Sequence, residues 1–203
     1  MTTAGTLQVR IQEADFDVAR ELEALQAGRV DIGAVASFTG CVRGGAAEGS
    51  LTALTLEHYP GMTERAIEAM LMEACQRFQV LRAIVIHRVG RLEPGARIVL
   101  VAVACAHRRE AFQACEFLMD YLKTHAPFWK KEATPAGERW VDARVADDEA
   151  LARWGIASAN ALGGEAAVPV EPAAAASDNA RHPDPTTIAD DASLATLSRA
   201  NPP

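Results

Sequence analysis

The sequence predicts an α+β fold with a mixed or antiparallel sheet. Runs that alternate apolar and polar residues, which is the pattern of strands, outnumber runs with the apolar spacing of helices. Short turn sequences join neighbouring strand patterns, as "LEPGA" does at 92–96 and "PAG" at 135–137. Such turns can join antiparallel strands, whereas parallel strands need long crossovers.

The N-terminal part predicts a strand, a helix and a second strand. "TLQVRIQ" at 6–12 alternates as a strand does. Residues 15–28 have helical spacing, and Gly28 is placed to end that helix. "IGAVASFTGCV" at 32–42 predicts a buried strand, and a glycine-rich loop follows at 43–50.

The middle part predicts a strand, a helix and two more strands. "LTALTLEHY" at 51–59 alternates as a strand, and a Pro-Gly turn leads from it into a helix at 62–78. Thr63 is the predicted N-cap of this helix. Two further strands, at 82–90 and 97–106, lie on either side of the "LEPGA" turn.

The next part predicts a long helix and a hairpin. The helix covers 108–125, and Pro127 lies just beyond it because proline cannot continue a helix. Residues 128–143 predict a hairpin in which Trp129 and Trp140 face each other across the two strands.

The composition changes sharply after Trp154. Residues 155–203 contain no aromatic residue and no lysine, but they hold six of the ten prolines and −4 of the net charge of −7. Such a segment cannot bury enough apolar surface to offset the entropy that ordering costs. The sequence therefore predicts a folded domain at 1–154 and an Ala/Pro-rich, acidic, disordered tail at 155–203.

Charge and composition exclude several classes of function. A net charge of −7 argues against a nucleic-acid binder, which needs a broad basic surface. No apolar run approaches the roughly 20 residues of a membrane span, and the first residues lack the features of a signal peptide. We therefore expect a cytoplasmic protein with no nucleic-acid or membrane partner. The four cysteines form no C-x-x-C pair and no histidine cluster completes a zinc site, so we expect reduced thiols, no metal and no cofactor.

The lysines are confined to one nine-residue window. Lys123, Lys130 and Lys131 are the only lysines, and the other seventeen basic residues are arginine. Arginine stays protonated, whereas a lysine amine that is desolvated or placed beside another cation can lose its proton and act as a base or nucleophile. The window therefore indicates a task that needs an amine. The alternative is a solvated basic end of the helix at 108–125, which the helix dipole favours.

A second group of cations indicates an anion site. His107, Arg108 and Arg109 lie where a predicted strand ends and the long helix begins, and helix N-termini bind phosphates. The alternative is that Glu110 or other carboxylates pair with the arginines. Arg43 opens the glycine-rich loop and suits closure over a ligand, although this signal is weak by itself.

Two other histidines are interpreted as structural. His87 lies in an apolar strand and is predicted to be hydrogen-bonded rather than a ligand. Adjacent strand residues point to opposite faces, so Glu57 and His58 are not expected to cooperate directly.

Five stretches of the chain together resemble one known family. They are "FTGCVRG", "LTLEHYPGMTERAI", "VIHRVGRLEPG", "AHRREAF" and "MDYLKTHAPFWKKEATPAGERWV". In this order they strongly resemble the large, catalytic subunit of molybdopterin synthase, from about residue 5 to residue 154. The resemblance implies an α/β hammerhead-like mixed sheet with an additional antiparallel subdomain, and it does not extend to the tail.

The resemblance implies a sulfurtransferase of molybdenum cofactor biosynthesis. Such an enzyme converts cyclic pyranopterin monophosphate (precursor Z) to molybdopterin by inserting two dithiolene sulfurs. The sulfur arrives as a thiocarboxylate on the C-terminal Gly-Gly of a small, ubiquitin-like carrier subunit. The large subunit is expected to form a homodimer with one small subunit at each end, which makes a heterotetramer.

The resemblance also implies roles for individual residues. Lys123 in "DYLKT" matches the essential lysine beside the thiocarboxylate, and Lys130 in "PFWKKE" matches a second active-site lysine. Arg43, His107 and Arg108 match residues that hold the pterin phosphate. The other residues expected to contact the substrate are Cys41, Val42, Lys131, Glu132 and Arg144, with Arg144 supplied across the dimer.

Position 41 departs from the family pattern. Relatives often carry lysine there, so Cys41 removes a possible substrate charge. Cys41 is then either a packing residue or an adventitious sulfur acceptor.

Two non-catalytic functions are the alternatives to an enzyme. The chain could be a scaffold that binds a ubiquitin-like carrier, or a sensor of a phosphorylated metabolite. Both explain an anion site, but arginine would serve in either, so neither explains the restriction of lysine to one window.

Overall fold

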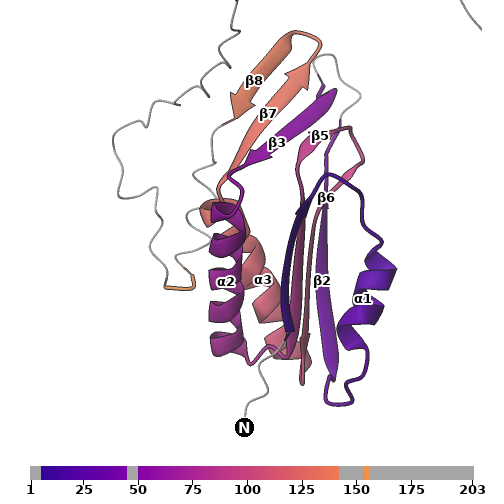
Figure 1. Ribbon diagram of the computed structural model, residues 1–203, viewed down its shortest axis with the longest axis vertical. Coiled ribbons are helices and arrows are strands. Elements are labelled where there is room, and N and C mark those ends of the chain that lie inside the picture. Colours follow the sequence, from indigo (N-terminus) through magenta and orange to yellow (C-terminus); the bar gives the residue numbers. More distant parts are fainter. Residues whose placement is uncertain (1–5, 45–49, 142–152, 156–203) are drawn as a thin grey trace, which may run out of the picture. The chain divides into compact units, whose positions relative to one another are not determined.

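The computed structural model describes residues 6–44, 50–141 and 153–155, all within one compact unit of the chain (Figure 1). The described residues form three helices and eight strands, so the predicted α+β class is confirmed. The elements in chain order are β1 (Thr6–Gln12), α1 (Val18–Gln26), β2 (Ala34–Cys41), β3 (Ala53–His58), α2 (Met62–Phe78), β4 (Arg82–Arg88), β5 (Gly90–Leu92), β6 (Arg97–Cys105), α3 (Arg108–His125), β7 (Phe128–Thr134) and β8 (Gly137–Val141).

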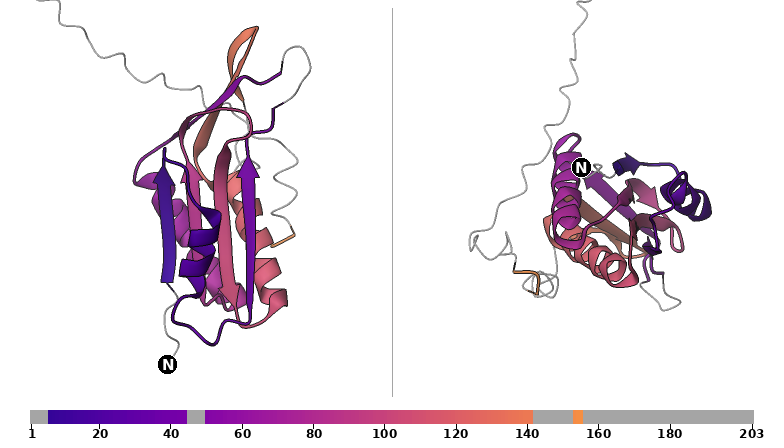
Figure 2. Two further views of the ribbon diagram at one scale, coloured as in Figure 1. Left: turned by 90° about the vertical axis from the view of Figure 1, so that its right-hand side faces the viewer. Right: turned by 90° about the horizontal axis from the view of Figure 1, so that it is seen from below.

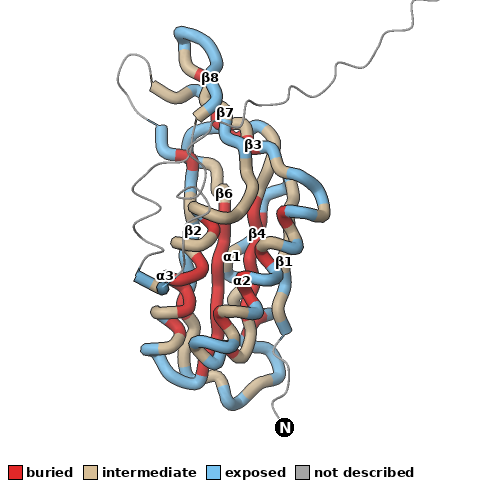
Figure 3. Tube along the Cα trace, turned by 90° about the vertical axis from the view of Figure 1, so that its left-hand side faces the viewer, coloured by how far each residue is buried: buried red, intermediate tan, exposed pale blue. Residues whose placement is uncertain are grey.

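Sheet A has the strand order β1-β4-β6-β2 and is covered by helices on both faces. Only β1 and β4 are parallel; the other neighbours are antiparallel. Helices α2 and α3 pack on one face and α1 on the other (Figures 1 and 2). Because strand side chains alternate, Val101 of β6 faces α2 and α3 while Leu100 faces α1. Strand β6 is therefore buried from Val99 to Cys105 (Figure 3).

The strand predicted at 32–42 is confirmed as β2, but the prediction that it is buried is wrong. Strand β2 lies at the edge of sheet A, beside β6 alone, and Phe38 is 41% exposed. The apolar run resembles a central strand, but its position in the strand order leaves the residues at 37–39 in contact with solvent.

Sheet B is an antiparallel sheet with the order β5-β3-β7-β8, beyond one end of sheet A (Figure 1). The single strand predicted at 82–90 is divided, because β4 ends at Arg88 in sheet A and β5 begins at Gly90 in sheet B. Gly90 has a φ of 78°, a conformation that glycine adopts without strain and that permits this change of direction.

The hairpin predicted at the end of the domain is confirmed as β7 and β8. Its register places Trp140 opposite Lys131, while Trp129 lies opposite Glu57 of β3. The prediction that the two tryptophans face each other is therefore wrong, because the turn fixes a different register from the one assumed.

The N-cap of helix α2 lies two residues before the predicted cap, Thr63. Gly61 is the N-cap, and its N–H donates to Glu64 Oε2 at 2.6 Å. Thr63 lies inside the helix and is fully buried. The cap prediction is wrong because Gly61, with a φ of 79°, makes the tight turn that begins the helix.

Two predictions fall on residues outside the described ranges. These are the position of Arg144 and, beyond Gly155, the tail. Among the helices that the structure describes, none is long and apolar enough to cross a membrane.

Candidate active site

Strand β7 brings Lys130 to the end of sheet A. Lys130 lies opposite Leu56 of β3, on the face of sheet B that also carries Phe128 and His58. The ring of Phe128 stacks on His87 at the end of β4, with centroids 3.8 Å apart and planes 16° apart. The exposed Lys130 therefore lies at the place where sheet A meets sheet B.

Lys123 lies at the same end of the domain. It is an exposed residue in the last turn of α3, which ends at the C-cap Ala126. Helix α3 follows β6 and runs back along it, so the C-terminus of α3 lies where β6 begins and β4 ends. Only Ala126 and Pro127 separate α3 from β7, so Lys123 and Lys130 lie on either side of this junction.

Lys131 has different surroundings from its neighbour. Its side chain is on the opposite face of sheet B, where Nζ lies 2.9 Å from Glu138 Oε2 and 5.5 Å from the centre of the Trp140 ring. Glu132 is on the face of Lys130 and accepts a hydrogen bond from Arg139 at 3.0 Å. Both residues are therefore already paired within the β7–β8 hairpin.

The residues at 41–43 lie at this end of sheet A as well. Cys41 ends β2 and is exposed, with a free thiol. The side chain of Val42 is buried, and its N–H and C=O are both hydrogen-bonded at 2.8 Å to the turn at 93–96. His87 of β4, Val99 of β6 and Gly40 of β2 lie side by side across sheet A. The exposed Arg43 follows Gly40 by three residues, so it lies just beyond this end of the sheet.

His107 and Arg108 lie at the opposite end. His107 is the N-cap of α3, Arg108 is its first residue, and both are exposed. With a rise of 1.5 Å per residue, Arg108 is about 22 Å along the helix from Lys123. Within one copy, the fold therefore does not bring the start of α3 close to Lys123. The alternative pairing with Glu110 is not seen either, because Glu110 Oε2 is buried without a hydrogen-bond partner in the part of the chain that the structure describes.

Burial sets the protonation state of His87. Its pKa is lowered to about 4, first by burial, which disfavours the charged ring, and further by the nearby charges of His58 and Lys130. Nδ1 lies 2.9 Å from Arg88 O and therefore carries the proton that it donates. The prediction of a hydrogen-bonded structural histidine is confirmed, but its position beside Lys130 had no signal in the sequence.

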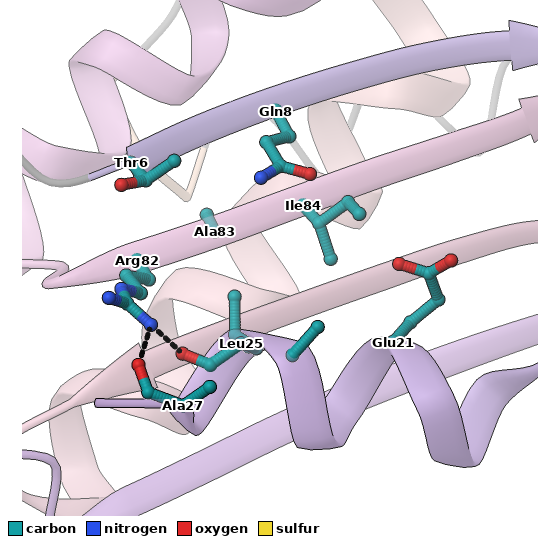
Figure 4. A pocket seen from close by; sticks show the side chains of 9 residues that line it. Thr6, Gln8, Glu21, Leu25, Ala27, Arg82, Ala83 and Ile84 are labelled. Atoms are coloured by element: carbon teal, nitrogen blue, oxygen red, sulfur yellow. Dashed lines mark hydrogen bonds between the residues drawn. The ribbon is translucent and has the colours of Figure 1, made fainter. Parts of the chain in front are cut away.

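A separate pocket of about 290 Å³ lies between α1 and the first residues of β1 and β4. Figure 4 shows that Arg82 closes one side of it by donating to the carbonyls of Leu25 and Ala27, at 3.1 and 2.7 Å. None of the predicted site residues lines this pocket. Among the described residues, no group of His, Cys, Asp or Glu side chains is placed to hold a metal.

Comparison with known proteins assigns the chain to a family. Residues 11–125, more than half of the chain, match the family described as MoaE protein. The chain belongs to the MoaE family. The α+β fold with its additional antiparallel sheet is confirmed, since solved MoaE structures are its structural neighbours.

Three relatives show how far the similarity extends. The molybdopterin synthase catalytic subunit of Ralstonia nicotianae is 60% identical over 153 residues, which are 75% of this chain and 87% of the relative. The solved molybdopterin cofactor biosynthesis protein E of Burkholderia multivorans is 56% identical, with a TM-score of 0.65, over 75% of this chain and 99% of that one. The molybdopterin synthase structure from Staphylococcus aureus is 28% identical, with a TM-score of 0.61, over 66% and 96%.

Proposed function

We propose that this MoaE-family chain is the catalytic subunit of a molybdopterin synthase. The observation that carries the proposal is the α3–β7 junction, which presents Lys123 and Lys130 at the end of sheet A that also holds Arg43. The enzyme converts precursor Z to molybdopterin in the cytoplasm, with sulfur from the C-terminal thiocarboxylate of a small ubiquitin-like carrier.

The proposed site residues have two tasks: arginine and histidine side chains bind the phosphate, and lysine side chains assist sulfur transfer. Arg43, His107 and Arg108 hold the pterin phosphate, because guanidinium groups and a helix N-terminus both favour phosphate, and Arg144 contacts the substrate from across the dimer. Lys123 and Lys130 set the charge and protonation of the thiocarboxylate and of the pterin side chain during sulfur transfer. Transfer leaves a thioester between carrier and substrate, which water cleaves before a second carrier delivers the second sulfur.

The other residues that are predicted to contact the substrate lie beside Arg43 or in the β7–β8 hairpin. The backbone of Val42 fixes Arg43, and Cys41 lies beside them at the end of β2. Lys131 and Glu132 form ion pairs with Glu138 and Arg139 across the β7–β8 hairpin. Because both side chains are already paired, we assign them only contacts at the margin of the substrate.

The complete site requires a second copy of the chain. Arg108 is about 22 Å along α3 from Lys123 in the same copy, too far for both to touch one small pterin. In the proposed homodimer the partner copy supplies His107, Arg108 and Arg144 to the lysines of the first copy. One carrier at each end of the dimer then completes a heterotetramer.

Reconstitution tests the proposed function. The purified chain is mixed with a thiocarboxylated carrier and precursor Z, and molybdopterin is followed as its fluorescent oxidation product. We expect product with the wild type, little with Lys123→Ala, and normal product with Arg20→Ala, which removes an exposed cation from α1. No product despite demonstrated carrier binding would instead support a non-catalytic carrier binder.

A further inference from the structure

The junction between α3 and β7 is fixed by a buried hydroxyl. Thr63 has 0% exposure, and its Oγ1 lies 3.3 Å from the carbonyl oxygen of Pro127, 64 residues away in sequence. Pro127 is the residue between the C-cap of α3 and the first residue of β7. The contact therefore ties the start of α2 to the only link between the helix of Lys123 and the strand of Lys130.

The hydroxyl group of Thr63 donates its hydrogen bond to the carbonyl oxygen of Pro127. Oγ1 also lies 3.2 Å from the carbonyl of Tyr59, but that carbonyl already accepts the N–H groups of Met62 and Thr63 at 3.1 Å. At the same time, Oγ1 accepts the N–H of Tyr59 at 3.2 Å. A hydroxyl has one proton to donate, and the carbonyl of Pro127 is the acceptor with fewer competing N–H groups, so this arrangement directs the proton to the junction.

The other side of the junction is held by stacking. Phe128 follows Pro127, and its ring lies against the buried ring of His87 with centroids 3.8 Å apart. The N–H of Phe128 donates to Ala126 O at 2.8 Å, which closes a tight turn around Pro127. The link is thus anchored to α2 by Thr63 and to β4 by His87, and both anchoring side chains are buried.

We propose that Thr63, through Pro127, is a positioning residue that sets Lys130 relative to Lys123. The proposal rests on the proposed function, in which both amines act on one substrate. A small displacement between two reacting groups is costly, since about 1 Å of misplacement can reduce a rate on the order of a hundredfold.

Steady-state kinetics of the full chain with carrier and precursor Z tests this role. Thr63→Val keeps the shape of the side chain and removes the hydroxyl, and Thr63→Ser restores the hydroxyl. The matched control is Thr52→Val, because the hydroxyl of Thr52 also donates to a carbonyl of β7, Ala133 O at 3.1 Å, but toward the other end of the strand from the α3–β7 junction.

For Thr63→Val we expect kcat to fall on the order of tenfold to a hundredfold, with the KM for the carrier within about twofold of the wild type. Thr63→Ser and Thr52→Val should keep kcat within about threefold of the wild type. Measurements are made at a temperature where all four proteins are folded. The role is rejected if Thr63→Val keeps its kcat, or if Thr52→Val loses as much.

A second readout does not depend on turnover. The amines of the chain are its three lysines and its N-terminus, so bis-succinimidyl esters of graded spacer length report directly on lysine geometry. In the wild type and Thr63→Ser, we expect the Lys123–Lys130 cross-link to show the same spacer preference, measured against the Lys130–Lys131 cross-link. In Thr63→Val the preference should broaden, and an unchanged preference would overturn the positioning role. A wild type that forms this pattern but makes no product would reject the proposed function and leave the positioning intact.

Discussion

Lys130 and Lys131 show that a shift of one position along a strand moves a side chain to the opposite face of the sheet. The two residues are adjacent, yet Lys131 is paired with Glu138 while Lys130 faces the junction with sheet A. The lysine window of the sequence is therefore two groups in space: Lys123 and Lys130 at the junction, and Lys131 in the hairpin. We propose that only the first group takes part in amine chemistry on the substrate.

Replacing Lys123 by arginine tests whether an amine is needed. Lys123→Arg keeps the positive charge, so binding of the carrier should stay within about twofold of the wild type. Turnover should fall at least tenfold or so, because a guanidinium cannot give up its proton as an amine can. Carrier affinity and kcat are measured side by side. Near-normal turnover would mean that charge alone is sufficient.

His87 makes stability depend on pH in a defined window. Its pKa is about 4 in the folded chain, against 6.5 as the ordinary value, so the unfolded chain binds more protons between these values. Stability therefore rises with pH from about 4 to 6.5, and this contribution is lost as pH falls through that window. The full difference amounts to at most about 3 kcal/mol.

Urea denaturation at pH 4.5 and pH 7 measures this dependence. His87→Phe keeps a ring to stack on Phe128 but cannot titrate, so its free energy of unfolding should change less between the two pH values than that of the wild type. His107→Asn, at an exposed position, should behave as the wild type. An equal pH dependence in His87→Phe and wild type would assign the effect to other groups.

At the scale of elements, the connection from β6 to α3 is tightly packed against the loop before β2. Gly33 N–H donates to Cys105 O at 3.0 Å, and a Cβ on Gly33 would lie only 2.2 Å from the carbonyl oxygen of Ala106. This contact lies immediately before His107 and Arg108, where the helix begins. No side chain can be accommodated there unless one of the two backbones moves.

Gly33→Ala should therefore destabilise the fold by about 1–3 kcal/mol, since the clash is with backbone rather than with a flexible side chain. The free energy of unfolding in urea measures the loss. Ser37→Ala, at an exposed position of the edge strand β2, is the control and should change stability little. An unchanged stability in Gly33→Ala would show that the loop relaxes freely.

At the scale of the whole molecule, α3 separates the two halves of the proposed site by its own length. The proposed site is completed by the partner copy, and mixed dimers test this directly. A dimer of one Lys123→Ala copy and one Arg108→Ala copy contains one intact site if the site is shared, and none if each copy forms its own.

Random mixing of the two inactive variants should therefore restore about a quarter of the wild-type activity, because about half of the dimers are mixed and each has one working site of two. Activity is measured after the subunits have been dissociated and reassembled together. Each variant reassembled alone is the control. Failure to recover activity, with mixed dimers shown to form, would place all the residues of one site in one copy.

The domain boundary near Trp154 is a proposal that truncation tests. Trp154 packs edge-on against Phe78 and Phe117, at 5.7 and 5.5 Å between ring centroids, and its indole N–H donates to Asp120 at 2.8 Å. A chain that ends at Gly155 should keep wild-type stability and turnover. A chain that ends at Val141 should lose both, because it lacks Trp154 and Arg144. Thermal denaturation and the reconstitution assay measure the two effects, and a loss in the chain that ends at Gly155 would give the tail a role.

The sequence predicted where helices and strands lie along the chain more reliably than which strands pair with each other. Local patterns are enough to place a strand at 6–12 or a helix at 108–125, because alternation and helical spacing are properties of the segment itself. The edge position of β2, the division at Gly90 and the pairing of Trp140 with Lys131 depend on which strand lies alongside, and no local pattern contains that information.

By itself, the sequence determined the class of the fold and the family, and it singled out the residue types of the proposed site. The restriction of lysine to one window and the cations at the start of α3 are chemical facts that are visible without a structure. Only the tertiary structure decided that Lys123 and Lys130 share a junction, that Lys131 is turned away, and that Arg108 lies about 22 Å along α3 from Lys123. The physical reason is that helix length and strand register convert positions in sequence into positions in space, and both are fixed by packing between distant segments.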